Sequence, residues 1–185
     1  MNKLNLELIK KTILDVPDYP KKGIIFKDIT PLLENPQAFK STIAAFKQLV
    51  EEEAKKSGKA IKKVLAIESR GFLFGAPLAL EMNCGLVIAR KPKKLPRELI
   101  SVDIQLEYGT DALAIHRDAI APGENILIID DVLATGGTAA GACQLIKKAG
   151  GNSVQAVFLI ELDFLKGRAQ LKTFDPLQII SLLQY

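Results

Sequence analysis

The sequence predicts an α/β fold with a mostly parallel, twisted sheet flanked by helices. Three observations support this prediction: short apolar runs, helical patterns between them, and polar residues directly after several runs. The apolar runs, typical of strands buried on both faces, cover residues 64–67, 86–89, 125–129, 154–162 and 177–183. Strands that alternate with helices in this way are typical of parallel sheets.

The helices have their own signals. Leu4 and Leu8 are four residues apart, as are Ile9 and Ile13, which predicts a short amphipathic helix before Pro17. A longer helix begins at Pro36 and ends near Gly58, with an apolar face formed by Phe39, Ile43, Phe46 and Val50. Further helical patterns cover residues 72–83 and the stretch that closes at Gly150 and Gly151; residues 163–171 form a short helix or turn.

The composition is that of a folded globular protein. The chain has 185 residues, of which 48% are hydrophobic and 25% charged, so we expect one domain over residues 1–185. Its net charge of +4 and pI near 9.0 suit either nucleic acid or an anionic small substrate. The choice between them depends on motifs.

Nothing in the sequence predicts export or membrane insertion. The first residues mix charges with leucines, and the longest apolar run, residues 71–80, is too short to span a bilayer. Cys84 and Cys143 lie far apart without metal-type spacing, which is typical of unreactive thiols in a reducing compartment. We therefore expect a cytoplasmic protein.

The most informative stretch is NILIIDDVLATGGTAAGACQLIKKA, residues 125–149. It orders a strand, two carboxylates (Asp130 and Asp131, called the acidic pair below), a loop of small residues, and a helix. The loop, residues 134–138, is called the glycine loop. Its lack of bulk lets a ligand approach main-chain N–H groups, and the adjacent helix N-terminus favours an anion.

This arrangement predicts a phosphorylated sugar as ligand. Neither G-x-x-x-x-G-K-[ST] nor G-x-G-x-x-G occurs in the chain, which argues against a nucleoside-triphosphatase or a dinucleotide-binding protein. The acidic pair would repel a phosphate but can bind ribose hydroxyls or a metal-bound sugar. A phosphorylated ribose satisfies both the loop and the acids.

The string IIDDVLATGGTAAG resembles the phosphoribosyl diphosphate (PRPP) signature of type I phosphoribosyltransferases, most closely that of the adenine phosphoribosyltransferases. The resemblance implies the single-domain type I phosphoribosyltransferase fold. It also implies that Asp130 and Asp131 bind the ribose hydroxyls and act in catalysis. The implied 5-phosphate site consists of Ala134, Thr135, Gly136, Gly137 and Thr138.

A second segment, DYPKKGIIFKDITPLL at residues 18–33, resembles the base-binding segment of the same family. Taken alone, Phe26 would more often be a core anchor. The resemblance implies that Phe26 stacks on adenine while the main chain of Ile24, Ile25 and Lys27 reads the base edge. Main-chain groups can distinguish an amino from an oxo substituent, because a mismatched group stays unpaired.

Two further segments resemble diphosphate-binding elements of this family. ESRGFLFG implies that Ser69 and Arg70 hold the diphosphate of PRPP, with Arg70 also catalytic; a surface arginine at a strand end is the alternative. RKPKKLP implies that Arg90, Lys91 and Lys94 neutralise the leaving group, although a basic run can also be a solvated or nucleic-acid-binding loop. Lys93 stands where the family commonly has glycine.

Residues 95–110 contain few helix or core signals, and we expect an irregular, flexible loop over residues 91–110. The resemblance implies a hood that closes over the site, with Glu107 bonding the purine ring and handling its proton. A solvated glutamate is the alternative. Residues 111–117 alternate like a strand and include His116, expected to be structural.

The resemblance implies conversion of adenine and PRPP into AMP and diphosphate, with Mg²⁺ carried by PRPP and no direct protein ligand to the metal. It also implies a homodimer, and neither nucleic acid nor membrane as a partner. Two alternatives remain open: a transferase for hypoxanthine, guanine or xanthine, and a PRPP-binding regulator without turnover. A regulator of this kind usually carries a DNA-binding domain, for which the residues before Asp18 are too few.

Overall fold

The computed structural model describes residues 3–106, 109–174 and 176–185. The chain forms two compact units, Met1–Gln48 and Leu49–Tyr185. The boundary falls within helix α3 (Pro36–Ser57). The expectation of one domain over residues 1–185 stays a prediction.

The first unit contains two short helices, a two-stranded antiparallel ribbon and the start of α3. Its elements are α1 (Lys3–Lys11), β1 (Leu14–Pro17), β2 (Ile25–Asp28) and α2 (Thr30–Glu34). Helix α3 begins as predicted, because the side-chain oxygen of Asn35 accepts the N–H groups of Gln37 and Ala38 at 3.1 and 3.0 Å. The segment at residues 18–33 is more regular than expected, since Phe26 lies on β2 and not on a loop.

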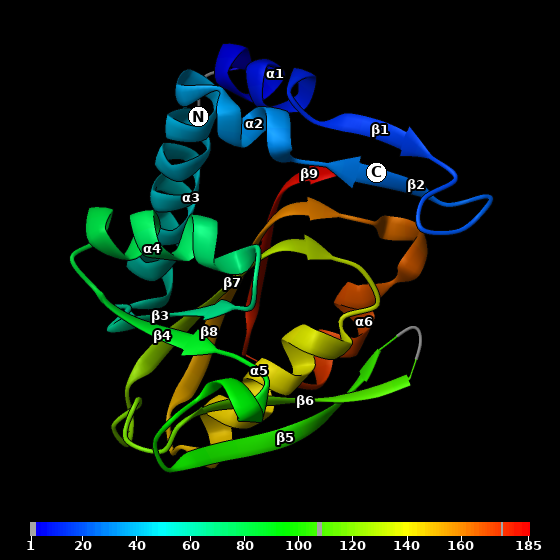
Figure 1. Cartoon of the computed structure of the whole chain (residues 1–185). Helices are drawn as coiled ribbons and strands as arrows, with labels where there is room; N and C mark the ends of the chain where they lie inside the picture. Colours follow the sequence, from blue (N-terminus) through cyan, green and yellow to red (C-terminus); the bar gives the residue numbers. More distant parts are fainter. Residues whose placement is uncertain (1–2, 107–108, 175) are drawn as a thin grey trace. The chain divides into compact units, whose positions relative to one another are not determined.

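The second unit is built on a five-stranded sheet in which every strand is parallel to its neighbours (Figure 1). The order is β4–β3–β7–β8–β9, with β3 Lys63–Ile67, β4 Gly85–Ala89, β7 Asn125–Leu133, β8 Asn152–Glu161 and β9 Gln178–Gln184. The chain winds outward from β3 in one direction and from β7 in the other. The carboxyl ends of β3 and β7 therefore flank a topological switch point, where open α/β sheets bind ligands.

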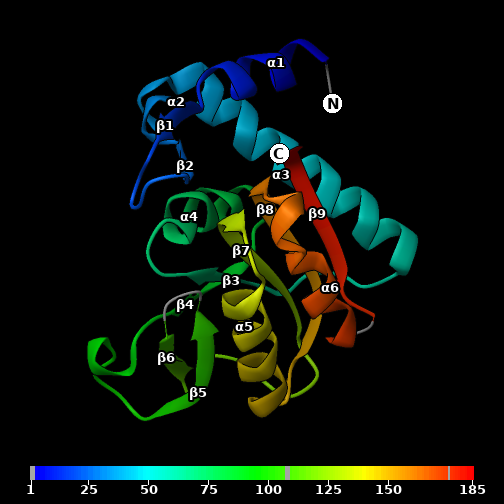
Figure 2. The ribbon, with the colours of Figure 1, turned by 90° about the vertical axis from the view of Figure 1, so that its right-hand side faces the viewer.

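Helices cover both faces of this sheet. Alternate residues of β3 point to opposite faces: Ala66 lies under Gly75 of α4 (Gly71–Glu81), whereas Leu65 and Ile67 join the core that includes α5 (Gly137–Lys148). Figure 2 shows α5 beside α6 (Gly167–Leu171), which lies between the 3₁₀ turns η2 (Asp163–Leu165) and η3 (Lys172–Phe174). Among the described residues, no helix has both the length and the apolarity to cross a bilayer.

The prediction of an irregular loop at residues 91–110 was wrong for most of that stretch. After the short turn η1 (Pro92–Lys94), β5 (Leu99–Leu106) pairs antiparallel with β6 (Gly109–His116). Ile104 is buried and packs on Gly141 of α5, where a methyl group would lie 2.2 Å from Ile104 Cγ2. Apolar residues at 100, 102 and 104 alternate with polar ones, and this period of two was the signal for a strand.

Candidate active site

The acidic pair lies inside β7, which continues four residues beyond the predicted end at Ile129. Asp131 is buried, with 3% of its surface exposed, whereas Asp130 keeps partial access to solvent. Burial, and then the charge of Asp131, raises the pKa of Asp130 well above its usual value. Burial also raises the pKa of Asp131, and the neighbouring Arg70 opposes that rise. The site thus holds two carboxylates that bind a proton or a cationic partner readily.

Arg70 supplies such a partner. Its Nε lies 2.9 Å from Oδ2 of Asp131. Arg70 immediately precedes α4, and the next residue, Gly71, packs so closely on β7 that a methyl group there would lie 2.8 Å from the carbonyl oxygen of Ile129. This close packing fixes the start of α4 beside the acidic pair, and it confirms that the end of β3 and the end of β7 meet.

The glycine loop leads from β7 into α5. Gly136 has a φ of +89°, a left-handed conformation that favours glycine, and the helix starts at Gly137. The first N–H groups of a helix have no partner within it, so they are available to an anion. A hollow of about 50 Å³ lies here, lined by all five loop residues together with Asp130 and Phe158. The loop therefore has the geometry of a small anion site next to the acids.

A support of the glycine loop was not predicted from the sequence. Gly167, the first residue of α6, packs against it so closely that a methyl group on Gly167 would lie 2.1 Å from the carbonyl oxygen of Ala134. The only sequence signal for this packing is a glycine, Gly167, within a polar turn. The distance in the chain between the two segments gave no reason to connect them.

The predicted diphosphate-binding cations lie past the ends of β3 and β4, and each pairs with a carboxylate. Arg90 donates through Nε and Nη2 to Glu68 at 3.2 and 3.1 Å, and Lys94 also contacts Glu68. Lys91 Nζ lies 2.5 Å from Oδ2 of Asp111. Ser69 is exposed and follows a cis peptide bond from Glu68. These residues form one polar cluster in the second unit.

Glu68 was missed as a partner for these cations. Its hydrogen bonds with Arg90, and then those with Lys94, lower its pKa from 4.5 to about 2 despite partial burial. A lowered carboxyl pKa stabilises the fold above the unfolded value, and the stabilisation is lost as pH falls through the folded value.

We expect Glu68→Gln to lower the free energy of unfolding at pH 7 by about 1–2 kcal/mol after allowance for solvent screening. The difference from the unsubstituted protein should shrink between pH 4.5 and about 2, the window set by the shifted pKa. Denaturant unfolding at a series of pH values measures it. Glu98→Gln is the matched control, because Glu98 is exposed and lies 3.5 Å from Arg117. If the difference in free energy of unfolding between Glu68→Gln and the unsubstituted protein did not depend on pH, the role of Glu68 would be contradicted.

The predicted base-binding residues belong to the first unit. Phe26 is partly exposed, and its ring meets Tyr19 edge to face, with centroids 5.3 Å apart. The main chain of Ile24 is engaged within the unit, since its N–H donates to Lys21 and its carbonyl accepts from Tyr19. The predicted roles of Ile24, Ile25, Phe26 and Lys27 stay predictions, and Glu107 lies outside the described residues.

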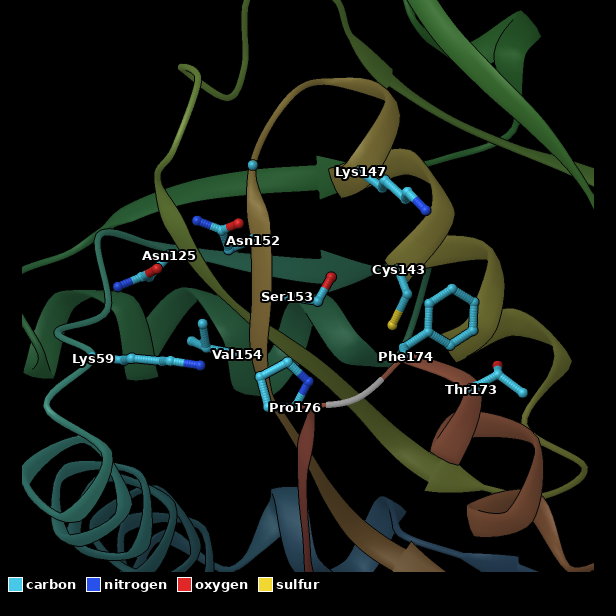
Figure 3. A pocket seen from close by; sticks show the side chains of 11 residues that line it. Lys59, Asn125, Cys143, Lys147, Asn152, Ser153, Val154, Thr173, Phe174 and Pro176 are labelled. Carbon is cyan, nitrogen blue, oxygen red and sulfur yellow. The ribbon is translucent and has the colours of Figure 1, made fainter.

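A larger cavity, of about 490 Å³, lies elsewhere in the second unit. Figure 3 shows it among side chains from the first residues of β7 and β8, from α5 and from η3, including Asn125, Asn152 and Cys143. The acidic pair lies nearer the other end of β7. The cavity therefore does not include the phosphate-binding and acidic residues, and the small hollow at the glycine loop remains the candidate site.

No cluster of three or more His, Cys, Asp or Glu side chains in the described part of the chain is arranged to hold a metal ion. The acidic pair offers two carboxylates at the switch point. Mg²⁺ prefers oxygen ligands and is commonly bound by one or two carboxylates together with substrate phosphates and waters. The donor set thus fits a magnesium ion that arrives with a phosphorylated substrate.

The fold, the glycine loop and the acidic pair define a type I phosphoribosyltransferase. Residues 28–174 match the family model of the phosphoribosyl transferase domain. The chain is 51% identical to adenine phosphoribosyltransferase of Shewanella pealeana over 185 residues, which is 100% of this chain and 97% of the relative. It is 51% identical to the adenine phosphoribosyltransferase of Yersinia pestis over 166 residues, which is 90% of this chain and 86% of the relative.

Solved structures agree with this assignment. The Saccharomyces cerevisiae adenine phosphoribosyltransferase, complexed with an imino-altritol bisphosphate and adenine, has a TM-score of 0.91 at 38% identity, covering 98% of this chain and 99% of that one. The Thermoanaerobacter pseudethanolicus enzyme has a TM-score of 0.87 at 46% identity, covering 97% and 99%. The chain belongs to the adenine phosphoribosyltransferase family, and it is a pentosyl-transferring enzyme.

Proposed function

We propose that this enzyme converts adenine and PRPP into AMP and diphosphate in purine salvage in the cytoplasm. The observation that carries the proposal is the direct succession of the acidic pair and the glycine loop on β7 and α5, beside a cluster of cations at the ends of β3 and β4. Two relatives that are adenine phosphoribosyltransferases align with this chain over all 185 residues. The thiols Cys84 and Cys143 are unbridged, which fits a reducing compartment.

The leaving diphosphate carries several negative charges, so the site must stabilise them as the bond to C1 of the ribose breaks. Arg70, Arg90, Lys91 and Lys94 supply positive charge, and the main chain at Ser69 supplies a hydrogen-bond donor. Without substrate these four cations pair with Asp131, Glu68 and Asp111. These carboxylates keep the cations oriented before the substrate binds. We expect the incoming diphosphate to compete with the carboxylates for the cations.

The ribose becomes oxocarbenium-like as the diphosphate departs, and it needs stabilisation of the opposite sign. Asp130 and Asp131 accept hydrogen bonds from the ribose hydroxyls, and their charge offsets the positive ring. The N–H groups of the glycine loop bind the 5-phosphate as a fixed anchor, so the sugar is held at both ends. Holding reactants in a defined geometry lowers the entropic part of the barrier.

Mg²⁺ accompanies PRPP in this proposal. When bound, the ion neutralises part of the diphosphate charge. Its ligands would come from PRPP and water, with no direct protein ligand, and Asp130 and Asp131 remain available to the ribose hydroxyls. We assign residues 91–110 the function of a hood that excludes water from the reaction, and Glu107 the handling of the proton that adenine loses.

Phe26 binds the base by stacking. Phe26→Ala should raise KM for adenine by about 10- to 100-fold, the usual effect of losing one base-stacking ring, and should change KM for PRPP much less. Steady-state kinetics with each substrate varied in turn measures both constants. The matched control is Phe164→Ala, because Phe164 is an exposed aromatic in the second unit. Equal increases in the two KM values would contradict a stacking role.

The decisive assay mixes the protein with PRPP, Mg²⁺ and one base at a time, and follows nucleotide and diphosphate formation. AMP from adenine supports the proposal. Product from hypoxanthine, guanine or xanthine but not from adenine would reassign the base. Tight PRPP binding without product from any base would favour a regulator.

We also propose a homodimer. Two neighbouring elements of the second unit expose large apolar side chains: Leu73 and Leu80 on α4, and Leu86 and Ile88 on the edge strand β4. Large exposed apolar patches mark interaction surfaces. Sizing with light scattering should give twice the 20.2 kDa chain mass. Leu80→Glu combined with Leu86→Glu should shift the protein to the monomer, and a monomeric unsubstituted protein would refute the dimer.

A further inference from the structure

Glu161 is a buried carboxylate at the end of β8, with 4% of its surface exposed. The reaction proposed above gives it no role. A buried carboxylate is unfavourable unless it is paired and hydrogen-bonded, so its partners should show what it does in the fold.

Those partners come from α6 and β9. Arg168 donates through Nε to Oε1 at 2.8 Å and through Nη2 to Oε2 at 2.5 Å, and the Ser181 hydroxyl donates to Oε2 at 2.6 Å. The third nitrogen of Arg168, Nη1, donates to the carbonyl oxygen of Ile179 at 2.9 Å. The Arg168 guanidinium accordingly lowers the pKa of Glu161. Arg168 thus joins α6 to the last two strands of the sheet by directional, charge-assisted bonds.

The residue before Arg168 touches the glycine loop. A methyl group on Gly167 would lie 2.1 Å from the carbonyl oxygen of Ala134 and 3.0 Å from the nitrogen of Gly136. A methyl group on Gly136 would lie 2.6 Å from the carbonyl oxygen of Gly167. Lys166, with a φ of +54°, turns the chain into α6 at this point. The main chain at Gly167 and the main chain of the glycine loop are therefore in close contact. Figure 2 shows α6 beside α5, the helix whose first residues belong to the glycine loop.

We propose that Glu161 and Arg168 are positioning residues for the glycine loop. Their ion pair holds the start of α6 against the loop, and the main chain of Gly167 then forms a wall behind Ala134 and Gly136. This packing restrains the loop main chain, so the loop N–H groups keep the orientation needed to bind the phosphate. The hydrogen bonds of Glu161 and Arg168 described above go to each other, to Ser181 and to Ile179, so we assign neither residue a contact with the substrate. The identity of the phosphate ligand rests on the proposed function, whereas the packing does not.

Arg168→Met tests the proposal, with ribose 5-phosphate as the probe in isothermal titration calorimetry. We expect its affinity to fall about 10- to 100-fold, as is typical when a binding group is misplaced by a fraction of an ångström to one ångström. KM for PRPP should rise by a similar factor, while KM for adenine stays nearly constant. Arg168→Lys should fall between the two proteins, because lysine keeps the charge but cannot bond both oxygens of Glu161 in a fork.

Three further variants separate positioning from general damage. Glu161→Gln combined with Arg168→Met removes both charges of the pair, including the buried carboxylate, and should be more stable than Arg168→Met alone while showing the same weak binding. Gly167→Ala displaces the wall without touching a charge and should also weaken ribose 5-phosphate binding. Arg117→Met is the control, since it removes an arginine from an exposed ion pair with Glu98 and should change nothing.

Folded Arg168→Met that binds ribose 5-phosphate within about twofold of the unsubstituted protein would overturn the proposal, as would equal rises in both KM values. If Arg168→Met does not fold, Arg168→Lys and Gly167→Ala decide, and unchanged affinity in both would overturn it. Failure of the proposed function would instead appear as no AMP formation by the unsubstituted protein. The calorimetric comparison remains valid in that case, because it needs only phosphate binding.

Discussion

Asp131→Asn is expected to lower kcat/KM for PRPP by about 10²- to 10³-fold, on the order of 3–4 kcal/mol of transition-state stabilisation. Asparagine keeps the shape of the side chain but loses the charge that opposes the positive ribose. It also leaves Arg70 without the carboxylate 2.9 Å from its Nε. Steady-state kinetics with PRPP varied measures the loss.

Asp131→Asn should be at least as stable as the unsubstituted protein. Burial raises the pKa of Asp131, so the fold disfavours its charged form, and near neutral pH that charge reduces stability. Removing it should leave the unfolding midpoint unchanged or raise it, as is common where function needs an unfavourable charge. Asp118→Asn is the control, because Asp118 is exposed and pairs with Arg97. Full turnover by Asp131→Asn would show that the charge does not contribute to catalysis.

Gly136→Ala is expected to raise KM for PRPP by about 10²-fold, since a shift of the loop by about 1 Å can have such an effect. The added methyl group would lie 2.6 Å from the carbonyl oxygen of Gly167, so either the loop or α6 must move. The φ of +89° adds backbone strain, and together we expect a destabilisation of about 1–3 kcal/mol. Kinetics and thermal unfolding measure the two effects.

Gly123→Ala separates strain from displacement of the loop. Gly123 has a φ of +79°, and a methyl group there would meet nothing within 4 Å. This variant should lose about 1 kcal/mol of stability with KM unchanged. If both variants raised KM equally, the effect would come from lower stability and not from the loop.

Local patterns predicted most of the second unit. Residues 64–67 and 86–89 are apolar runs with few polar interruptions, and they form β3 and β4 almost as predicted. The acidic pair and the glycine loop occupy consecutive residues, so one strand-to-helix connection necessarily brings them together. The prediction of an irregular loop over residues 91–110 was wrong at residues 99–106, because Pro96 and the charges hid a short alternation of apolar residues.

The sequence by itself determined the parallel sheet, the helix that starts at Pro36, and the order of acids, glycines and helix at the site, because each depends on the period of a short segment. Only the tertiary structure decided which charges meet. Glu68 pairs with Arg90 and Lys94, 22 and 26 residues away, since parallel neighbours end at the same edge of the sheet. Gly167 likewise reaches the glycine loop only because the turn after β8 folds back toward the end of β7. Such contacts follow from strand order and packing, which no local period encodes.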